Sequence, residues 1–254
     1  MSVQPHDTGE VLVGVDGPVV TVTINRPAKK NALTQAMYRT LSDTLLAADQ
    51  DLHISAVVVT GSPGAFTSGN DLVDFASGVD LDQVTRFLHA IATIRVPVVA
   101  AVNGLAIGVG LTMLLHFDLV YTEPDARFSV PFAALGLVPE AASSLLLPKT
   151  VGARHASELL LAGRSIDGIE ATAWGLCTEV ASPVLPAALD VAHRLANMPP
   201  EALRTTKALL RSEEGTVTGR MHEEMAAFAS ALQGPEFAEV MAARSEKRDP
   251  DFRR

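Results

Sequence analysis

Two short runs of apolar residues limit what this chain can fold into. The run SAVVVTG spans residues 55–61 and the run VPVVAAVNG spans residues 96–104. Strands that are apolar at every position are typical of a parallel sheet that is covered by helices on both faces. Loops and helical segments separate the two runs, so we expect right-handed strand–helix–strand crossovers. The chain is therefore predicted to have an α/β fold with a layered core.

The ends of the chain add different elements to this core. Residues 11–24 predict an antiparallel hairpin around an Asp-Gly-Pro turn, and Thr34 is a suitable N-cap for the helix that follows. From Pro183 onward the pattern is helical, with helices predicted at 185–196, 200–211, 220–232 and 235–247. We therefore divide the chain into an α/β core, residues 1–182, and a helical C-terminal region, residues 183–254, that serves packing or assembly.

Composition narrows the classes of function. The chain has 254 residues, of which 48% are hydrophobic, and its formal net charge is −9. An acidic chain is a poor partner for nucleic acid or for an anionic membrane surface. We expect a cytoplasmic protein, because the N-terminus lacks a secretory h-region and no apolar run reaches transmembrane length. The single cysteine, Cys177, excludes an internal disulfide and is predicted to lie in an apolar strand of the core.

Several common catalytic motifs are absent from the sequence. It contains no phosphate-binding P-loop, no His-Glu-x-x-His zinc motif and no Gly-x-Ser-x-Gly nucleophile elbow. The seven histidines lack metal-ligand spacing, so no metal site is predicted. Gly108 and Gly110 begin a helix after a strand, but the third glycine and the acidic residue of a dinucleotide site are missing. A nicotinamide site is therefore rejected.

Two strand-to-loop transitions remain as candidate binding elements. The segment GAFTSGNDL, residues 64–72, follows the first apolar strand, and NGLAIGVG, residues 103–110, follows the second. Small residues let the backbone approach a ligand closely, and a helix start exposes unpaired N–H donors. Two such N–H groups from neighbouring strands can hold one developing oxyanion. Tight turns and helix packing explain the same glycines, so the spacing alone leaves both interpretations open.

Four ordered sequence blocks resemble the crotonase (enoyl-CoA hydratase/isomerase) superfamily. They are NRP with NAL at residues 25–33, SGNDL at 68–72, NGLAIGVG at 103–110 and LGLVPE at 135–140. The resemblance covers nearly the whole chain. It implies a crotonase-like spiral of ββα units with a C-terminal helical trimerisation region, and assembly as a homotrimer or a dimer of trimers.

The resemblance also implies an acyl-CoA thioester substrate in fatty-acid metabolism (β-oxidation), with coenzyme A as part of the substrate and no separate cofactor. The backbone N–H groups of Asn70 and Val109 would form the oxyanion hole for the thioester carbonyl. Lys29 or Lys30 would meet a CoA phosphate, although surface lysines beside a proline are usually only solvated. The implied substrate-binding residues are Lys29, Ala65, Ser68, Gly69, Asp71, Leu72 and Gly108.

The type of reaction depends on where the acid–base groups lie. Hydratases of the family use two glutamates, and the matching positions here are Thr112 and Phe132, which cannot activate water. Glu140 matches the catalytic glutamate of the peroxisomal type of Δ3,Δ2-enoyl-CoA isomerase, which moves a proton from C2 to C4 with one carboxylate. Desolvation by apolar neighbours is expected to raise the pKa of this carboxylate. These neighbours are Val138, Pro139, Ala141 and Ala142.

Other roles for Glu140 stay open from the sequence. A glutamate just before a helix also serves as a capping or solvated loop residue. Alternatives within the superfamily are an enoyl-CoA hydratase, a dienoyl-CoA isomerase, a thioester hydrolase or, with Asp at this position, a dehalogenase. A non-catalytic acyl-CoA-binding protein is the alternative from another class. The catalytic hypotheses require Glu140 to face a site near the Asn70 and Val109 amides.

Overall fold

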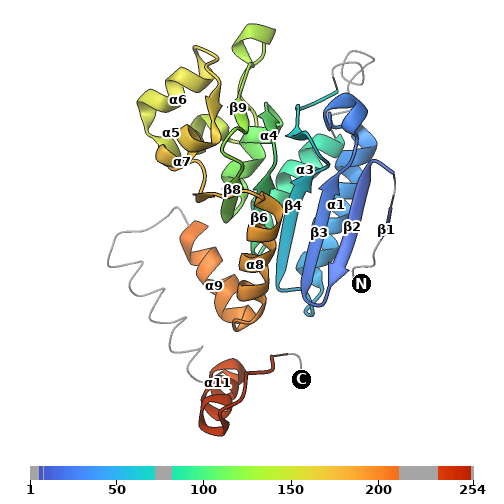
Figure 1. Cartoon of the computed structure of the whole chain (residues 1–254), viewed down its shortest axis with the longest axis vertical. Helices are drawn as coiled ribbons and strands as arrows, with labels where there is room; N and C mark the ends of the chain where they lie inside the picture. The colour runs from blue at the N-terminus through green and yellow to red at the C-terminus, as the bar shows by residue number, and fades with distance from the viewer. Residues whose placement is uncertain (1–5, 8, 72–81, 212–233, 253–254) are drawn as a thin grey trace.

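The computed structural model has a parallel sheet at its centre (Figure 1). It describes residues 6–7, 9–71, 82–211 and 234–252. The strands of the larger sheet lie in the order β1-β2-β3-β4-β6-β8-β11. From β3 to β11 all neighbours are parallel, and the N-terminal hairpin adds β2 and β1 as antiparallel strands. The strands are β1 (His6–Asp7), β2 (Val11–Asp16), β3 (Val19–Ile24), β4 (Ala56–Gly61), β6 (Val98–Val102), β8 (Leu119–Thr122) and β11 (Glu179–Val180).

A second, smaller sheet is built from very short strands in the order β10-β9-β7-β5. They are β5 (Ala65–Thr67), β7 (Leu105–Ile107), β9 (Arg127–Ser129) and β10 (Ile166–Asp167). The sequence prediction was wrong where it treated the β5 and β7 segments as loop and helix start. Strands of three residues are too short to show a periodicity, so pairing with neighbours decides their conformation.

Helices cover both faces of the larger sheet (Figure 1). Helices α1 (Gln35–Gln50) and α3 (Asp82–Thr93) pack against each other over one face, and α8 (Val184–Ala196) packs on β4 and β6 over the other. The Thr34 hydroxyl caps α1 by accepting from the Met37 N–H, as predicted. The other helices are η1 (Pro27–Lys29), α4 (Val109–Thr112), η2 (Met113–His116), η3 (Ala133–Leu135), α5 (Ser143–Val151), α6 (Ala153–Leu160), α7 (Gly168–Ala173), α9 (Pro200–Arg211) and α11 (Pro235–Glu246).

Three of the four predicted C-terminal helices are confirmed as α8, α9 and α11. The fourth, predicted at 220–232, lies outside the described residues. Cys177 is buried as predicted, but it precedes β11 instead of lying in a strand. The division of the chain at residue 183 and the assembly role of the C-terminal region stay predictions.

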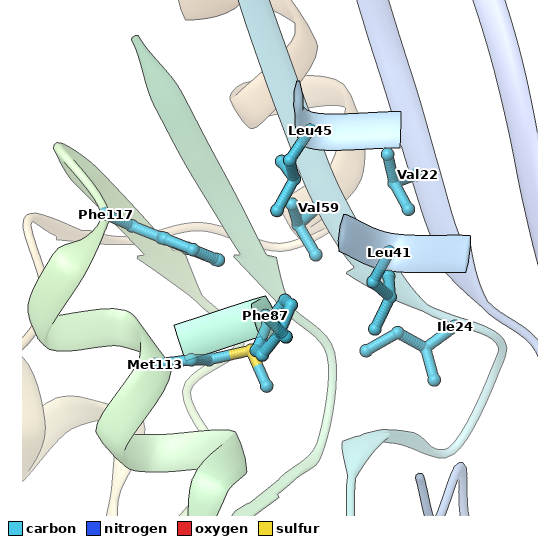
Figure 2. A pocket seen from close by; sticks show the side chains of 8 residues that line it. All are labelled: Val22, Ile24, Leu41, Leu45, Val59, Phe87, Met113 and Phe117. Carbon is cyan, nitrogen blue, oxygen red and sulfur yellow. The ribbon is translucent and has the colours of Figure 1, made fainter. Parts of the chain in front are cut away.

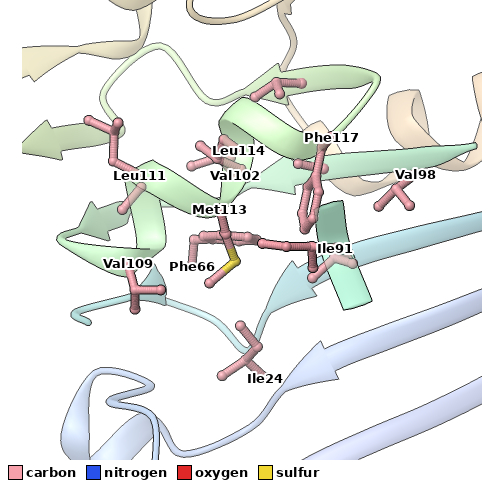
Figure 3. Packing of buried hydrophobic residues seen from close by; sticks show 14 of the residues in the cluster. Ile24, Phe66, Ile91, Val98, Val102, Val109, Leu111, Met113, Leu114 and Phe117 are labelled. Carbon is pink, nitrogen blue, oxygen red and sulfur yellow. The ribbon is translucent and has the colours of Figure 1, made fainter. Parts of the chain in front are cut away.

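Apolar side chains fill the space between the sheet and its helices. Figure 3 shows Phe66, Val109, Leu111, Met113 and Phe117 packed with side chains from the strands. A void of about 10 Å³ lies between α1, α3 and the sheet (Figure 2). Ligand pockets measure hundreds of Å³, so this void belongs to the core. Its lining is entirely apolar: Val22, Ile24, Leu41, Leu45, Val59, Phe87, Met113 and Phe117.

Helix α9 closes the amino edge of the sheet through buried cations. The Lys207 ammonium donates to the Val96 carbonyl and to the Asp118 carboxylate, each at 2.6 Å. The Arg204 guanidinium donates to the carbonyls of Asp49 and Ile54 at 3.1 and 3.4 Å. These acceptors precede or begin the parallel strands, so α9 leaves the opposite, carboxyl edge of the sheet for the candidate site.

Candidate active site

The candidate site lies where the central parallel strands end. Strands β3, β4 and β6 run in the same direction, so the segments that leave them meet at the carboxyl edge of the sheet. In open parallel sheets this edge is where ligands bind. The segments after β3, β4 and β6 begin at Asn25, Ser62 and Asn103. They contain the sequence blocks from which the site was predicted.

The loops that follow β4 and β6 are in close contact at two glycines, Gly69 and Gly110. A Cβ on Gly69 would lie 2.9 Å from the Ile107 carbonyl oxygen, and Gly69 has a φ of +93°. A Cβ on Gly110 would lie 2.7 Å from the Thr67 methyl carbon. Distances this short leave no room for a side chain, so glycine at these positions sets how closely the loops approach. The glycines therefore have a packing role that also fixes the two backbones relative to each other.

Asn31 ties the first of these loops to the end of β3. Its side chain is fully buried, and its backbone is left-handed with a φ of +59°. The amide nitrogen donates to the Ala65 carbonyl at 2.6 Å, and the amide oxygen accepts from the Arg26 N–H at 2.8 Å. The Asn31 carbonyl accepts from the Thr67 hydroxyl at 2.7 Å, and that hydroxyl accepts from the Gly69 N–H at 3.1 Å. This chain of hydrogen bonds holds the backbone that leads to Asn70.

The N–H groups of the two predicted oxyanion donors, Asn70 and Val109, have no acceptor among the described residues. Leu33 bridges the Asn70 segment through the Gly69 carbonyl and the Asp71 N–H, which leaves the Asn70 N–H on the other side. Val109 is the first residue of α4, where an N–H has no acceptor within the helix. Within the described chain neither N–H finds a hydrogen-bond acceptor. The predicted oxyanion role requires both N–H groups to lack an acceptor within the protein, and in the described chain they do.

The Glu140 side chain turns inward toward α4. Its Oε1 atom accepts a hydrogen bond from the Thr112 hydroxyl, and its Oε2 atom is buried without a hydrogen-bond partner among the described residues. Thr112 lies three residues after Val109 and donates its N–H to the Gly108 carbonyl at 3.0 Å. The carboxylate thus contacts the residue that lies one helical turn after Val109, the second predicted oxyanion donor. A solvated loop role for Glu140 does not agree with this orientation.

Burial raises the pKa of the Glu140 carboxyl, and the hydrogen bond from Thr112 opposes that rise. The expected direction and its cause, desolvation, are confirmed, but three of the four neighbours that were expected to bury the carboxylate are exposed. Val138, Pro139 and Ala142 are exposed, so they do not desolvate the carboxylate. The burial comes from residues distant in the sequence, including fully buried Thr112. A carboxylate with a raised pKa takes up a proton more readily than an exposed carboxylate does, as a proton-transferring group requires.

Tyr38 connects the carboxylate to the first loop. Its hydroxyl donates to the side-chain oxygen of Asn70, and burial together with the nearby Glu140 charge raises the pKa of Tyr38 well above its ordinary value. Tyr38 therefore stays protonated and remains a donor. No pattern in the sequence signals this role, because a tyrosine on the apolar face of a helix is normally a core residue. Its ring does pack against Phe87 at 5.3 Å.

The remaining predicted residues lie around the first loop or at the start of α4. Ser68 donates its N–H to the Lys30 carbonyl and its hydroxyl to the Lys29 carbonyl, so exposed Lys29 lies beside the loop. Asp71 forms an ion pair with Arg26 at 2.6 Å. Gly108, the N-cap of α4, has a φ of +57°. Ala65 is buried in β5, and Leu72 lies outside the described residues.

The described residues contain no group of three or more His, Cys, Asp or Glu side chains that could hold a metal ion. None of the described helices is both long enough and apolar enough to cross a membrane. The arrangement that the structure does contain, a buried carboxylate beside the start of α4, is suited to acid–base chemistry.

A comparison with family models agrees with this geometry. The model described as enoyl-CoA hydratase/isomerase matches residues 15–254. The chain belongs to this family. Its mixed α/β architecture, with parallel sheets and flanking helices, is the crotonase fold, as the sequence predicted.

Relatives in the enoyl-CoA hydratase/isomerase family carry names of both reactions. Enoyl-CoA delta isomerase 2 of Rattus norvegicus is 38% identical over 226 residues, which are 84% of this chain and 57% of that protein. The chain thus spans little more than half of the rat relative. The 2,3-dehydroadipyl-CoA hydratase of Escherichia coli is 34% identical over 251 residues, which are 96% of this chain and 98% of that protein.

Solved structures in the family superpose over almost the full length. The enoyl-CoA hydratase/isomerase of Pseudoalteromonas atlantica is 45% identical, with a TM-score of 0.78 over 96% of this chain and 99% of that chain. A protein of Magnetospirillum magneticum is 39% identical, with a TM-score of 0.93 over 97% of this chain and 100% of that chain. These matches support the family assignment and do not separate isomerases from hydratases.

We predict that Gly110→Ala destabilises the protein although alanine favours a helix. The new Cβ would collide with Thr67, and such overpacking costs about 1–3 kcal/mol. Thermal unfolding should show a lower Tm than the wild type. The matched control is Gly14→Ala, because Gly14 is exposed and a Cβ added there would have no atom within 4 Å. Equal Tm values for both variants would contradict the close contact of the two loops.

Proposed function

We propose that this member of the family is a Δ3,Δ2-enoyl-CoA isomerase and that Glu140 is its catalytic base. The observation that supports the proposal is the buried Oε2 atom of Glu140, which has no hydrogen-bond partner among the described residues, while the other oxygen of the same carboxylate is bonded to Thr112, one helical turn after Val109. A carboxylate oxygen in this state is free to accept a proton from carbon. One carboxylate is sufficient for moving one hydrogen along one face of a substrate.

In the proposed reaction, Oε2 of Glu140 removes a proton from C2 of a 3-enoyl-CoA. The electron pair of the C2–H bond enters a dienolate, and the negative charge collects on the thioester oxygen. The N–H groups of Asn70 and Val109 donate hydrogen bonds to that oxygen. The protonated Glu140 then returns the proton at C4 as the electrons shift, so the double bond moves from C3–C4 to C2–C3 and the carboxylate is restored.

The oxyanion donors and the Glu140 carboxylate contribute separately to the proposed rate acceleration. One oxyanion donor contributes about 10²–10³ in rate, and a positioned acid–base group about 10²–10⁴. Burial of Glu140 makes its carboxylate a stronger base, which favours removal of a proton from carbon. Burial also keeps water from the protonated acid before the proton reaches C4.

An enoyl-CoA hydratase is the second candidate, because relatives over the whole chain are named hydratases. Hydration in this family requires two carboxylates, and the matching positions hold Thr112 and Phe132. Thr112 is fully buried and its hydroxyl is bonded to Glu140, while the Phe132 ring lies 3.9 Å from the Cβ position of Gly108. Neither residue can bind and deprotonate a water molecule. This favours the isomerase over the hydratase.

The wider setting of the reaction is also part of the proposal. We infer an acyl-CoA thioester of fatty-acid metabolism as the substrate, with coenzyme A as its carrier group. We infer a homotrimer or a dimer of trimers in the cytoplasm. Lys29 is the proposed contact for a CoA phosphate, since it is exposed beside the Ser68 loop.

Glu140→Gln should abolish most of the isomerase activity. Glutamine keeps the size of the side chain but cannot take a proton, so kcat on 3-hexenoyl-CoA should fall by about 10²–10⁴, while KM changes little. Steady-state assays of the wild type beside this variant measure the effect. Exposed Glu179 offers the control Glu179→Gln, which should behave as the wild type. Full activity in Glu140→Gln would show that another residue is the base.

The rate should fall as the pH is lowered through the raised pKa of Glu140, because only the unprotonated carboxylate removes a proton. The acidic limb of kcat/KM should therefore lie above the ordinary glutamate pKa of about 4.5. His116 is the other titrating group nearby, and burial lowers its pKa. Measuring the pH dependence of the residual activity of Glu140→Gln shows whether the acidic limb of kcat/KM belongs to Glu140. A limb that persists in this variant would belong to another group.

A further inference from the structure

The Glu140 carboxylate is asymmetric in its contacts. The Thr112 hydroxyl donates to Oε1, whereas Oε2 is buried and has no partner in the described part of the chain. Thr112 is fully buried, so water does not compete for its hydroxyl. The two oxygens of one carboxylate are therefore in different chemical states. One is occupied by the protein and the other is available.

Thr112, which bonds only one of the two Glu140 oxygens, lies on a segment that is packed into the core. Leu111 and Met113, on either side of Thr112, are fully buried and pack into the core together with Val109 (Figure 3). The Thr112 N–H donates to the Gly108 carbonyl at 3.0 Å. The Thr112 hydroxyl is thus held at a fixed place relative to the Val109 N–H, the second proposed oxyanion donor.

The backbone after Glu140 is also bonded to the segment that contains Thr112, through His116. Ala141 and Ala142 are both left-handed, each with a φ of +53°, a conformation that is unfavourable for a residue with a Cβ atom. The Nε2 atom of His116 donates to the Ala141 carbonyl at 2.8 Å. Thr112 and His116 lie one helical turn apart, so α4 and η2 contact both the carboxylate of Glu140 and its backbone.

We propose that Thr112 is a positioning residue that selects Oε2 of Glu140 as the proton-transferring oxygen by occupying Oε1. This inference rests on the proposed isomerase function, in which Glu140 is the base. Without the hydroxyl, rotation about the Cγ–Cδ bond would present either oxygen to the substrate, and neither would be held at the distance from C2 and C4 that proton transfer requires. Hydratases of the family have an acid–base glutamate at the position of Thr112. In this chain the residue at that position instead orients the carboxylate of Glu140.

Thr112 also sets how easily Glu140 gains a proton. Its hydroxyl donates to the charged form of the carboxylate, which favours that form and opposes the effect of burial. Among the described residues, the other titratable groups that face this carboxylate or its backbone are Tyr38 from α1, which stays neutral, and His116 from η2. Neither of them changes when the Thr112 hydroxyl is removed, so a shifted titration would report the loss of that hydrogen bond.

Two matched pairs of variants test the proposal. Wild type and Thr112→Val differ by a hydroxyl in place of a methyl group, and Thr112→Ser and Thr112→Ala differ only by a hydroxyl. The second pair remains usable if the valine variant does not fold. Thermal unfolding checks the fold of each variant, and the assay measures kcat, KM and the pH dependence of kcat/KM with 3-hexenoyl-CoA.

In each pair, the member without the hydroxyl should have a lower kcat by about 10-fold to 100-fold, the effect of one hydrogen bond to a charged group. KM should stay the same, because the N–H donors and the CoA contacts are unchanged. The acidic limb should move to higher pH, since the carboxylate loses a donor that favours its charged form. The serine variant should recover both kcat and the wild-type limb.

Equal kcat values and an unmoved acidic limb within both pairs would overturn the role of Thr112. That result differs from failure of the proposed function. If the wild type does not convert 3-hexenoyl-CoA, or if Glu140→Gln remains fully active, the isomerase assignment is wrong whatever the Thr112 variants do. If the wild type is active and Glu140→Gln is not, the Thr112 pairs decide the inference on their own.

Discussion

The close contact between the loops that leave β4 and β6 is the constraint on which the site depends. Gly69 lies against the Ile107 carbonyl and Gly110 against Thr67, and neither position has room for a Cβ atom. Backbone groups from different strands converge on one ligand atom only when their loops approach this closely. Buried Asn31 holds the first loop in this place: its side-chain amide bonds Arg26 and Ala65, and its backbone carbonyl accepts from the Thr67 hydroxyl. A packing requirement and a proposed catalytic requirement thus fall on the same glycines.

The surroundings of Glu140 differ from the glycine contacts, because here the local arrangement is unfavourable for stability. A buried carboxylate oxygen without a partner among the described residues is unfavourable, and two successive left-handed alanines add backbone strain. Such an arrangement persists only where the surroundings fix it, and here the hydroxyl of Thr112 and the ring of His116 do so. Both residues belong to a segment that is embedded in the core. The strain therefore lies next to a fully buried segment, residues 111–113, which holds it in place.

The sequence was informative where a pattern is local. Apolar runs predicted β4 and β6, Thr34 predicted a helix start, and the ordered blocks predicted the family. It was uninformative where the partner is remote. The Tyr38–Asn70 and Thr112–Glu140 contacts join residues 32 and 28 positions apart, and three of the four apolar neighbours that were expected to bury Glu140 are exposed instead. Whether a loop carboxylate is buried depends on tertiary packing, which the residues adjacent to it in the sequence do not determine.

The most direct test of the central claim, that one carboxylate isomerises an acyl-CoA without adding water, is to identify the product. Purified wild-type protein is incubated with 3-hexenoyl-CoA, and the product is analysed by mass spectrometry and NMR. Our account predicts 2-hexenoyl-CoA with the mass of the substrate and a conjugated double bond. A main product that is heavier by one water, the 3-hydroxy ester, would contradict it, because it would require a second acid–base group beside Glu140.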